Sequence, residues 1–587
     1  MKMIKQLAKS VREYKRPSLI TLFLMIGEAV IESVIPFITA TYLINYLSTA
    51  ETIEVGRVVR IGLVLAVMAM CSLACGGLAG FTCAKASSGF AKNLRHDLFH
   101  KVQDFTFTNI DRFSSSSLVT RLTTDVSNVQ MAYMMIIRTA IRCPLMLIFS
   151  VVMAAYMGGL LAVTFAVVIP VLGVGLFFIG KKAMPAFRRV FKKYDRLNES
   201  IEENVRGMRV VKGFAREDYE KKKFGKEADS ICEDFTKAEK IVALNTPLMN
   251  FCMYFNMAVI LLLGSFMAIK GIGGVNVGQI SALLTYGMQI LMSLMMLSMI
   301  YVMLTMSTES AKRICEVLNE VPDMTEPENP VREVADGSVD FDGVSFKYSA
   351  QAKKFALEDI DLHIASGMTV GILGGTGSSK SSLVQLIPRL YDATEGTVRV
   401  GGRDVRDYGI ADLRDAVAVV LQKNLLFSGT IKENLRWGNP NATDAELVEA
   451  CRLAQADEFV RSFPDGYDTK IEQGGTNVSG GQKQRLCIAR ALLKKPKILI
   501  LDDSTSAVDT KTDALIRAGF RQYIPETTKI IIAQRVASVQ DADLIVVMNN
   551  GRIEAKGTHA ELMASSPIYR EVYEQQTNGG AEDEADE

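Results

Sequence analysis

The sequence predicts an all-α membrane domain of six spans, followed by an α/β domain. Two observations support this fold class. Nearly all the long uncharged runs of the 587-residue chain lie before residue 310. After residue 337 the hydropathy falls, and strand-like and helix-like patterns alternate as they do in α/β domains. The formal net charge of +1 argues against a nucleic-acid-binding protein, which normally carries a basic excess.

The first 17 residues, MKMIKQLAKSVREYKRP, are basic and amphipathic. The apolar run that follows is too long for a signal peptide and lacks a small-residue cleavage pattern. We therefore expect residues 1–17 to form a helix that lies on the cytoplasmic surface of the membrane, ahead of the first span.

Residues 18–320 are predicted to form the membrane domain. A span needs about 20 mainly apolar residues to cross a hydrocarbon core of about 30 Å. Six segments meet this requirement: 18–46, 57–83, 134–157, 159–180, 244–268 and 278–306.

The loops between these segments differ sharply in charge. Loops 84–133 and 181–243 are long and rich in Lys and Arg, whereas STAETIEVG and YMGG have neither and KGIGGVNVG has only Lys270. The positive-inside rule therefore places both termini and both long loops in the cytoplasm. We expect a multi-pass protein of a bacterial cell membrane. Both long loops have helical patterns, so the spans are expected to continue into the cytosol as helices.

Two carboxylates fall inside the first span. Glu28 and Glu32 are four residues apart and thus share one helix face. Carboxylates within a membrane are costly and are therefore candidates for a substrate cavity. The alternative is that they point into a polar bundle interior or pair with Arg138 or Arg142.

Methionines recur every three or four residues along the last span. Flexible thioethers suit a surface that accommodates varied apolar ligands, but methionine at helical spacing is more often ordinary packing. Both interpretations stay open for Met288, Met292, Met295, Met299, Met303 and Met306. The first four are our candidates for the substrate cavity.

After a linker at residues 321–337, residues 338–575 are predicted to form the α/β domain. MTVGILGGTGSSKSSLVQLI reads as a strand, a glycine-rich turn and a helix start. Such a turn directs backbone N–H groups at phosphate, Lys380 adds a positive charge, and Ser381 offers a hydroxyl to Mg²⁺. The strict G-x-x-x-x-G-K-[ST] pattern fails at one position, because Ser379 replaces its second glycine.

Further motifs follow in a specific order. VSGGQKQR, residues 478–485, is a second glycine turn that could bind an anion, and ILILDD is an apolar strand that ends in Asp502. From about residue 10 to 575, the sequence resembles the ATP-binding cassette (ABC) exporters with six spans fused to one nucleotide-binding domain. The resemblance implies a type IV exporter fold, with an antiparallel β subdomain and a helical signature subdomain in the ATPase domain. It also implies ATP and Mg²⁺ as cofactors.

The resemblance assigns functions to individual residues. ATP binding falls to Tyr348, Gly374, Gly375, Thr376, Gly377, Ser378, Ser379, Lys380, Ser381 and Ser382. The implied Mg²⁺ ligands are Ser381, Gln422 and Asp502, and the catalytic positions are Asp503, Gln534 and Gln422.

Other assigned residues act between subunits or domains. The signature turn, which closes over the ATP of a partner subunit, is formed by Ser479, Gly480, Gly481 and Gln482. Asp509 matches a loop that links the two ATP sites, and Glu472 matches a contact to the ends of the spans. Stretches 114–126 and 208–220 resemble the two coupling helices that press on the ATPase domains.

The chain departs from the family at three positions of one half-site. Asp503 stands where a longer Glu normally polarises the attacking water, and a misplacement of about 1 Å can cost on the order of 10²-fold in rate. Gln534 replaces the switch histidine, and an amide can neither hold a positive charge nor shuttle a proton at neutral pH. Ser379 places a side chain where close approach to phosphate usually requires glycine.

These departures predict a half-site that binds ATP and hydrolyses it poorly. The expected assembly is a heterodimer, similar to bacterial heterodimeric multidrug exporters, in which the partner supplies the missing Glu and His. The expected cargo is amphipathic hydrophobic compounds that are moved out of the cytoplasm, and the lipid bilayer is a further expected partner. Alternatives are a lipid or peptide exporter of the same architecture, and a regulatory ATP-sensing subunit that moves no substrate. The acidic tail, residues 576–587, is expected to be disordered.

Overall fold

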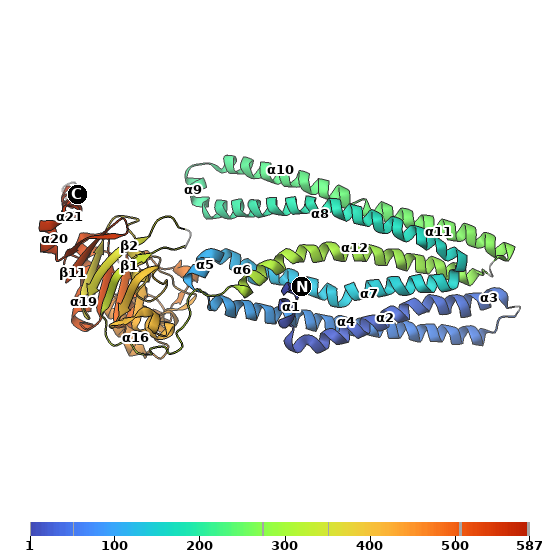
Figure 1. Cartoon of the computed structure of the whole chain (residues 1–587), viewed down its shortest axis with the longest axis horizontal. Helices are drawn as coiled ribbons and strands as arrows, with labels where there is room; N and C mark the ends of the chain where they lie inside the picture. The colour runs from blue at the N-terminus through green and yellow to red at the C-terminus, as the bar shows by residue number, and fades with distance from the viewer. Residues whose placement is uncertain (1, 51, 273–274, 350–351, 504–507, 584–587) are drawn as a thin grey trace. The chain divides into compact units, whose positions relative to one another are not determined.

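The computed structural model describes residues 2–50, 52–272, 275–349, 352–503 and 508–583 (Figure 1). The chain divides into two compact units. The first comprises Met1–Asp104 and Phe113–Glu320, and the second comprises Phe105–Arg112 and Val321–Glu587.

The first unit consists of long helices that lie side by side (Figure 1). Its helices are α1 (Lys2–Lys9), α2 (Lys15–Ile38), α3 (Asn45–Thr49), α4 (Val55–Gln103), α6 (Ser115–Thr120), α7 (Val126–Gly158), α8 (Val163–Arg206), α9 (Met208–Gly213), α10 (Glu217–Val242), α11 (Asn245–Lys270) and α12 (Val277–Asn319). Within this unit α12 packs most extensively on α7, and α2 packs on α4. The six predicted spans therefore lie on α2, α4, α7, α8, α11 and α12.

The third and fourth spans form a helical hairpin with almost no loop. Among the described residues, five helical runs are long and apolar enough to cross a membrane, and the run Ser115–Val190 holds both of these spans. Helix α7 ends at Gly158, and Gly159 adopts a non-helical conformation with φ 48° and ψ −119°. Because positive φ suits glycine, the YMGG sequence lets the chain reverse into α8 within a few residues (Figure 1).

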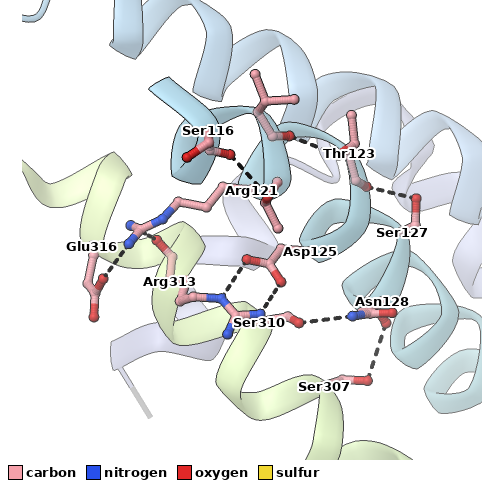
Figure 2. Close-up of polar contacts among 12 residues, drawn as sticks. Ser116, Arg121, Thr123, Asp125, Ser127, Asn128, Ser307, Ser310, Arg313 and Glu316 are labelled. Atoms are coloured by element: carbon pink, nitrogen blue, oxygen red, sulfur yellow. Dashed lines mark hydrogen bonds and ion pairs between the residues drawn. The ribbon is translucent and has the colours of Figure 1, made fainter. Parts of the chain in front are cut away.

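An ion pair between the buried carboxylate of Asp125 and Arg313, whose side chain is 48% exposed, joins α12 to the start of α7 (Figure 2). Asp125, which is 0% exposed, accepts hydrogen bonds from two nitrogens of Arg313, the Nε bond measuring 2.7 Å. The neighbouring Arg121 donates to the Arg313 carbonyl at 2.7 Å and forms an ion pair with Glu316 at 3.1 Å. Asp125 and Arg121 lie on one π-helical turn, Arg121–Asp125, so a local widening of the helix presents both side chains to α12.

A mixed sheet forms the centre of the second unit. Its strand order is β12 (Arg552–Gly557), β11 (Leu544–Asn549), β3 (Thr369–Leu373), β10 (Thr528–Ile532), β9 (Ile498–Asp502) and β6 (Val417–Val420). All neighbours are parallel except the β11 and β12 pair. Every residue of β9 and β10 is buried, which explains why the segments ILIL of β9 and III of β10 are continuous apolar runs rather than alternating ones.

Two further parts surround this sheet. The antiparallel subdomain has the strand order β2 (Leu357–Ile364), β1 (Val339–Phe346), β4 (Glu395–Val400) and β5 (Arg403–Asp404). The helical subdomain contains α15 (Ile431–Arg436), α16 (Asp444–Leu453), α17 (Asp457–Ser462), α18 (Gly480–Leu492) and the short pair β7 (Gly429–Thr430) and β8 (Lys470–Ile471). The remaining helices are α5 (Phe107–Phe113), α13 (Lys380–Gln385), α14 (Ile410–Ala416), α19 (Thr510–Tyr523), α20 (His559–Ser565) and α21 (Pro567–Asp583). The predicted fold class is thus confirmed.

Helix α21 extends to Asp583, and residues 584–587 lie outside the described residues. The disorder expected of the acidic tail, residues 576–587, stays a prediction.

Candidate nucleotide-binding site

Three of the predicted motifs meet at one edge of the central sheet. The glycine-rich turn follows β3, Gln534 follows β10, and Asp502 and Asp503 stand at the end of β9. Strand β10 lies between β3 and β9 and is parallel to both, so the carboxyl ends of all three strands lie together. Ligands of open α/β sheets bind at this edge.

The glycine-rich turn requires glycine where it is tightest. Gly374 has φ 155°, and a Cβ there would lie 2.3 Å from the carbonyl oxygen of Met548. The Nζ atom of Lys380 donates to the carbonyl oxygens of Gly374 and Gly375, both at 2.8 Å. Burial lowers the pKa of Lys380, while nearby carboxylates act in the opposite direction. The loop thus holds a cation against its own backbone, where phosphate would bind.

Ser379 adopts a left-handed backbone conformation, with φ 69° and ψ 26°, immediately before α13. Residues with a Cβ rarely adopt this conformation, which costs them roughly 1–2 kcal/mol. Ser379 therefore has the backbone conformation that would suit the expected glycine.

Replacing Ser379 by Gly is expected to stabilise the second unit by about 1 kcal/mol, because the backbone strain of the folded state disappears. The greater freedom of glycine in the unfolded chain offsets part of this gain. Urea unfolding of the full chain measures this change. Ser379→Ala is the matched control, since it keeps the Cβ and should give no gain. An equal gain from both variants would show that the serine hydroxyl, not the backbone conformation, causes the instability.

The residues predicted to hold Mg²⁺ lie close to one another. Ser381 donates a hydrogen bond from its hydroxyl to Asp502 Oδ1 at 2.9 Å. Asp502 is 5% exposed, and burial raises the pKa of its carboxyl while the bond from Ser381 opposes that rise. A hydroxyl, a carboxylate and the amide oxygen of Gln422 are hard oxygen donors of the kind that suit Mg²⁺.

Asp503 is held between two glutamine side chains. Its Oδ2 atom accepts hydrogen bonds from Gln534 Nε2 at 2.8 Å and from Gln422 Nε2 at 3.2 Å. The backbone of Asp503 is left-handed, with φ 48°, and the residue is 8% exposed. The structure therefore brings together all three residues assigned to catalytic positions.

Tyr348 lies next to the helix that follows the glycine-rich turn. Its hydroxyl is 2.7 Å from Ser382 Oγ on α13, and its ring packs edge-on against Tyr391 with the centroids 5.2 Å apart. The residue is 44% exposed, so part of the ring surface is open to a planar ligand.

The predicted signature turn forms the start of α18. Ser479 Oγ accepts from the Gln482 N–H at 3.2 Å, and Gln482 Oε1 accepts from the Ser479 N–H at 2.9 Å. This reciprocal arrangement is a capping box, which stabilises the helix start without any ligand. Ser479 and Gly480 are exposed, as expected of residues that would meet a partner's nucleotide.

The remaining two candidates in this unit are engaged locally. Asp509 caps α19 by accepting from the Thr512 N–H at 2.9 Å, and that hydrogen bond lowers its pKa. Glu472 is exposed and accepts from the hydroxyl of Thr476 at 2.8 Å.

Comparisons with known proteins agree with this geometry. The family model for the ABC transporter transmembrane region matches residues 18–294, and the ABC transporter model matches residues 357–506. YfiB of Bacillus subtilis (strain 168), named an uncharacterized ABC transporter ATP-binding protein, is 36% identical over 559 residues, covering 95% of this chain and 96% of the relative. This chain belongs to the ABC transporter family.

A second relative is named for the substrate that it transports. The fatty acid ABC transporter ATP-binding/permease protein of Mycobacterium bovis is 33% identical over 479 residues, covering 82% of this chain and 75% of that protein. Among solved structures, a bacterial Atm1-family ABC exporter with ATP bound has a TM-score of 0.82 at 23% identity, and covers 96% of this chain and 98% of that chain. This last likeness shows the fold of this ABC transporter.

The substrate-cavity candidates separate into two groups. Glu28 and Glu32 lie 3.6 Å and 2.6 Å from Arg142 in ion pairs, which is the alternative considered from the sequence. Met295 and Met299 line a cavity of about 470 Å³ between α8, α10, α11 and α12. Two other methionines of the same helix, Met288 and Met292, are about half exposed.

The first predicted coupling stretch and the segment that precedes it fall in different units. The segment that groups with the ATPase unit is Phe105–Arg112, whereas stretch 114–126 belongs to the membrane unit. Phe107 packs against Tyr391 with ring centroids 5.9 Å apart, and Asp111 accepts from the Tyr391 hydroxyl at 2.7 Å. The sequence FTFTNID carried the missed signal, since its aromatic residues have an apolar surface to bury.

Proposed function

We propose that this chain is one subunit of an ATP-driven exporter of amphipathic hydrophobic compounds, and that its own half-site retains ATP rather than hydrolysing it. The observation that carries this proposal is the environment of Asp503. Its side chain is one methylene shorter than Glu, and one of its oxygens already accepts from Gln422 and Gln534. Neither amide can take up a proton at neutral pH, so Gln422 and Gln534 cannot act as the switch histidine would beside this carboxylate.

The parts that would bind nucleotide are present. Lys380 would hold the β- and γ-phosphates together with the N–H groups of the turn, and Tyr348 would stack on adenine. Ser381, Asp502 and Gln422 would hold Mg²⁺, which neutralises phosphate charge during phosphoryl transfer. Binding without efficient hydrolysis follows, because the attacking water is poorly positioned while the phosphates are held.

A partner subunit completes the proposed machine as a heterodimer. The exposed signature turn at Ser479 would close over the partner's ATP, where the partner supplies the catalytic Glu and switch His. Helix α9, in the second predicted coupling stretch, exposes Val210 at 61%, and Phe214 just after it is 76% exposed. These apolar side chains would pack on the partner's ATPase domain. In this arrangement both termini and both ATPase domains are cytoplasmic, in a bacterial cell membrane.

The Mycobacterium bovis relative, a fatty acid transporter by name, supports a second candidate cargo for an exporter of the same architecture. Fatty acids are themselves amphipathic, so a lipid-like cargo narrows the proposed substrate class without changing the machine. A regulatory subunit that binds ATP without transport is less well supported, because Phe105–Arg112 already packs on the ATPase unit as a coupling segment would.

The decisive experiment compares the purified chain with the chain co-purified with its partner. We expect slow ATP hydrolysis by the chain alone and rapid hydrolysis by the pair. Equal rates would overturn the asymmetric assignment. Replacing the partner's catalytic Glu by Gln should then stop export of a fluorescent amphipathic dye from membrane vesicles, and unchanged export would contradict the transporter assignment.

A further inference from the structure

Helices α8 and α12 enclose a cavity of about 710 Å³ in the membrane unit. Most of its wall is apolar and comes from both helices, through Leu176, Phe177, Met184, Leu294 and Leu297. A volume of this order is typical of cavities that bind small organic molecules.

Two basic side chains give this cavity a polar end. Lys181 and Arg188 both line it, and they lie seven residues apart on α8, which places them on one face about 10 Å apart along the axis. No carboxylate lines the cavity, and neither basic side chain has an ion pair or hydrogen bond in the described part of the chain. The pKa of Glu309 is lowered mainly by its hydrogen bond with Lys312, and the positive charge of Arg188 lowers it further.

Most of the apolar wall lies on the side of the predicted spans, while Met184 and Pro185 lie between the two basic residues. The α8 residues before 181 that line the cavity belong to the predicted span 159–180, whereas Lys181 and Arg188 follow that span. On α12, Leu294 and Leu297 lie inside the predicted span 278–306, with Tyr301 one turn closer to its end. Basic side chains at this depth lie where the hydrocarbon gives way to the interface.

We propose that this cavity binds a single-chain anionic amphiphile as cargo, with its acid group between Lys181 and Arg188 and its hydrocarbon chain along Phe177 and Leu294. This inference rests on the proposed exporter function and narrows its substrate class to acids. The neighbouring cavity of about 470 Å³ shares Leu176, Gly180, Met184 and Ser298 with it, which leaves room for a long chain. That neighbour contains Glu239, which would repel an acid group.

The test measures binding of radiolabelled palmitate to the full chain in phosphatidylcholine nanodiscs. Lys181→Gln/Arg188→Gln should weaken palmitate binding on the order of tenfold or more, because both charges that face the acid are removed. Lys182→Gln/Arg189→Gln is the matched control: it removes the same charge from adjacent exposed positions and should leave binding unchanged. Hexadecanol, which has the chain without the charge, should bind all three proteins equally.

Several outcomes would contradict the proposal. Equal palmitate binding by the wild type and Lys181→Gln/Arg188→Gln would show that the two charges do not hold the acid group. An equal loss of binding in the control variant would show that any surface charge near the membrane has the same effect. Displacement of palmitate by phosphatidylglycerol would show a site for bilayer lipid rather than cargo. Dye export by the pair tests the exporter function separately: export without palmitate binding would refute only this inference, and palmitate binding without any export would refute only the exporter.

Discussion

Replacing Asp503 by Glu together with Gln534 by His is expected to raise ATP hydrolysis by the chain alone by about 10²-fold, because a base moved by about 1 Å into reach of its water changes rates by that order. The Oδ2 atom of Asp503 now accepts from Gln534 and Gln422. The longer carboxylate would extend past these amides toward the γ-phosphate. Steady-state phosphate release from the purified full chain measures the gain.

Two variants control for changes unrelated to the base. Asp503→Asn keeps the size of the side chain without its charge and should not accelerate hydrolysis. Gln534→His alone should give much less than the double variant, since the short carboxylate remains. If the double variant still binds ATP but hydrolyses it as slowly as the wild type, then Asp503 and Gln534 are not the cause of slow hydrolysis at this half-site.

Replacing Arg313 by Leu is expected to destabilise the membrane unit by about 3 kcal/mol, because the carboxylate of Asp125 would lose the charge that compensates it. Asp125 is 0% exposed and accepts two hydrogen bonds from Arg313 (Figure 2). Hydrogen exchange at the amides of α7 and α12 in the full chain measures the loss, since these helices are joined by the pair.

The neighbouring Lys312 provides a matched control on the same helix. Its ion pair with Glu309, at 2.8 Å, joins two side chains that are each more than half exposed. Lys312→Leu should therefore cost less than about 1 kcal/mol. The double variant Asp125→Leu/Arg313→Leu should recover part of the loss. If Arg313→Leu and Lys312→Leu lower the protection of these amides equally, the ion pair of Asp125 with Arg313 contributes no more stability than a surface pair.

The sequence was most informative where one residue type has one physical role. Apolar runs of span length predicted the membrane helices, and the order of the motifs after residue 337 predicted the ATPase fold. Parallel pairing of β3, β10 and β9 then explains why segments more than 100 residues apart meet at one edge. The three departures at Ser379, Asp503 and Gln534 were visible because a strong pattern surrounds them.

Other features depend on tertiary contacts and could not be read from local patterns. The segment Phe105–Arg112 groups with the ATPase unit and contacts Tyr391, nearly 300 residues away. The bond from Asp125 to Arg313 likewise joins positions 188 residues apart. In both cases the sequence shows a polar or aromatic residue of ordinary type, and only the packed structure shows its partner.

The hydrogen bond between Gln534 and Asp503 has a consequence for cells whose interior acidifies. A histidine would change its charge between about pH 5 and 8, whereas an amide keeps the same donors throughout that range. The hydrogen-bond donors that position 534 offers to a nucleotide would therefore not change during acid stress, and in the proposed heterodimer the titrating switch residue would be the partner's histidine.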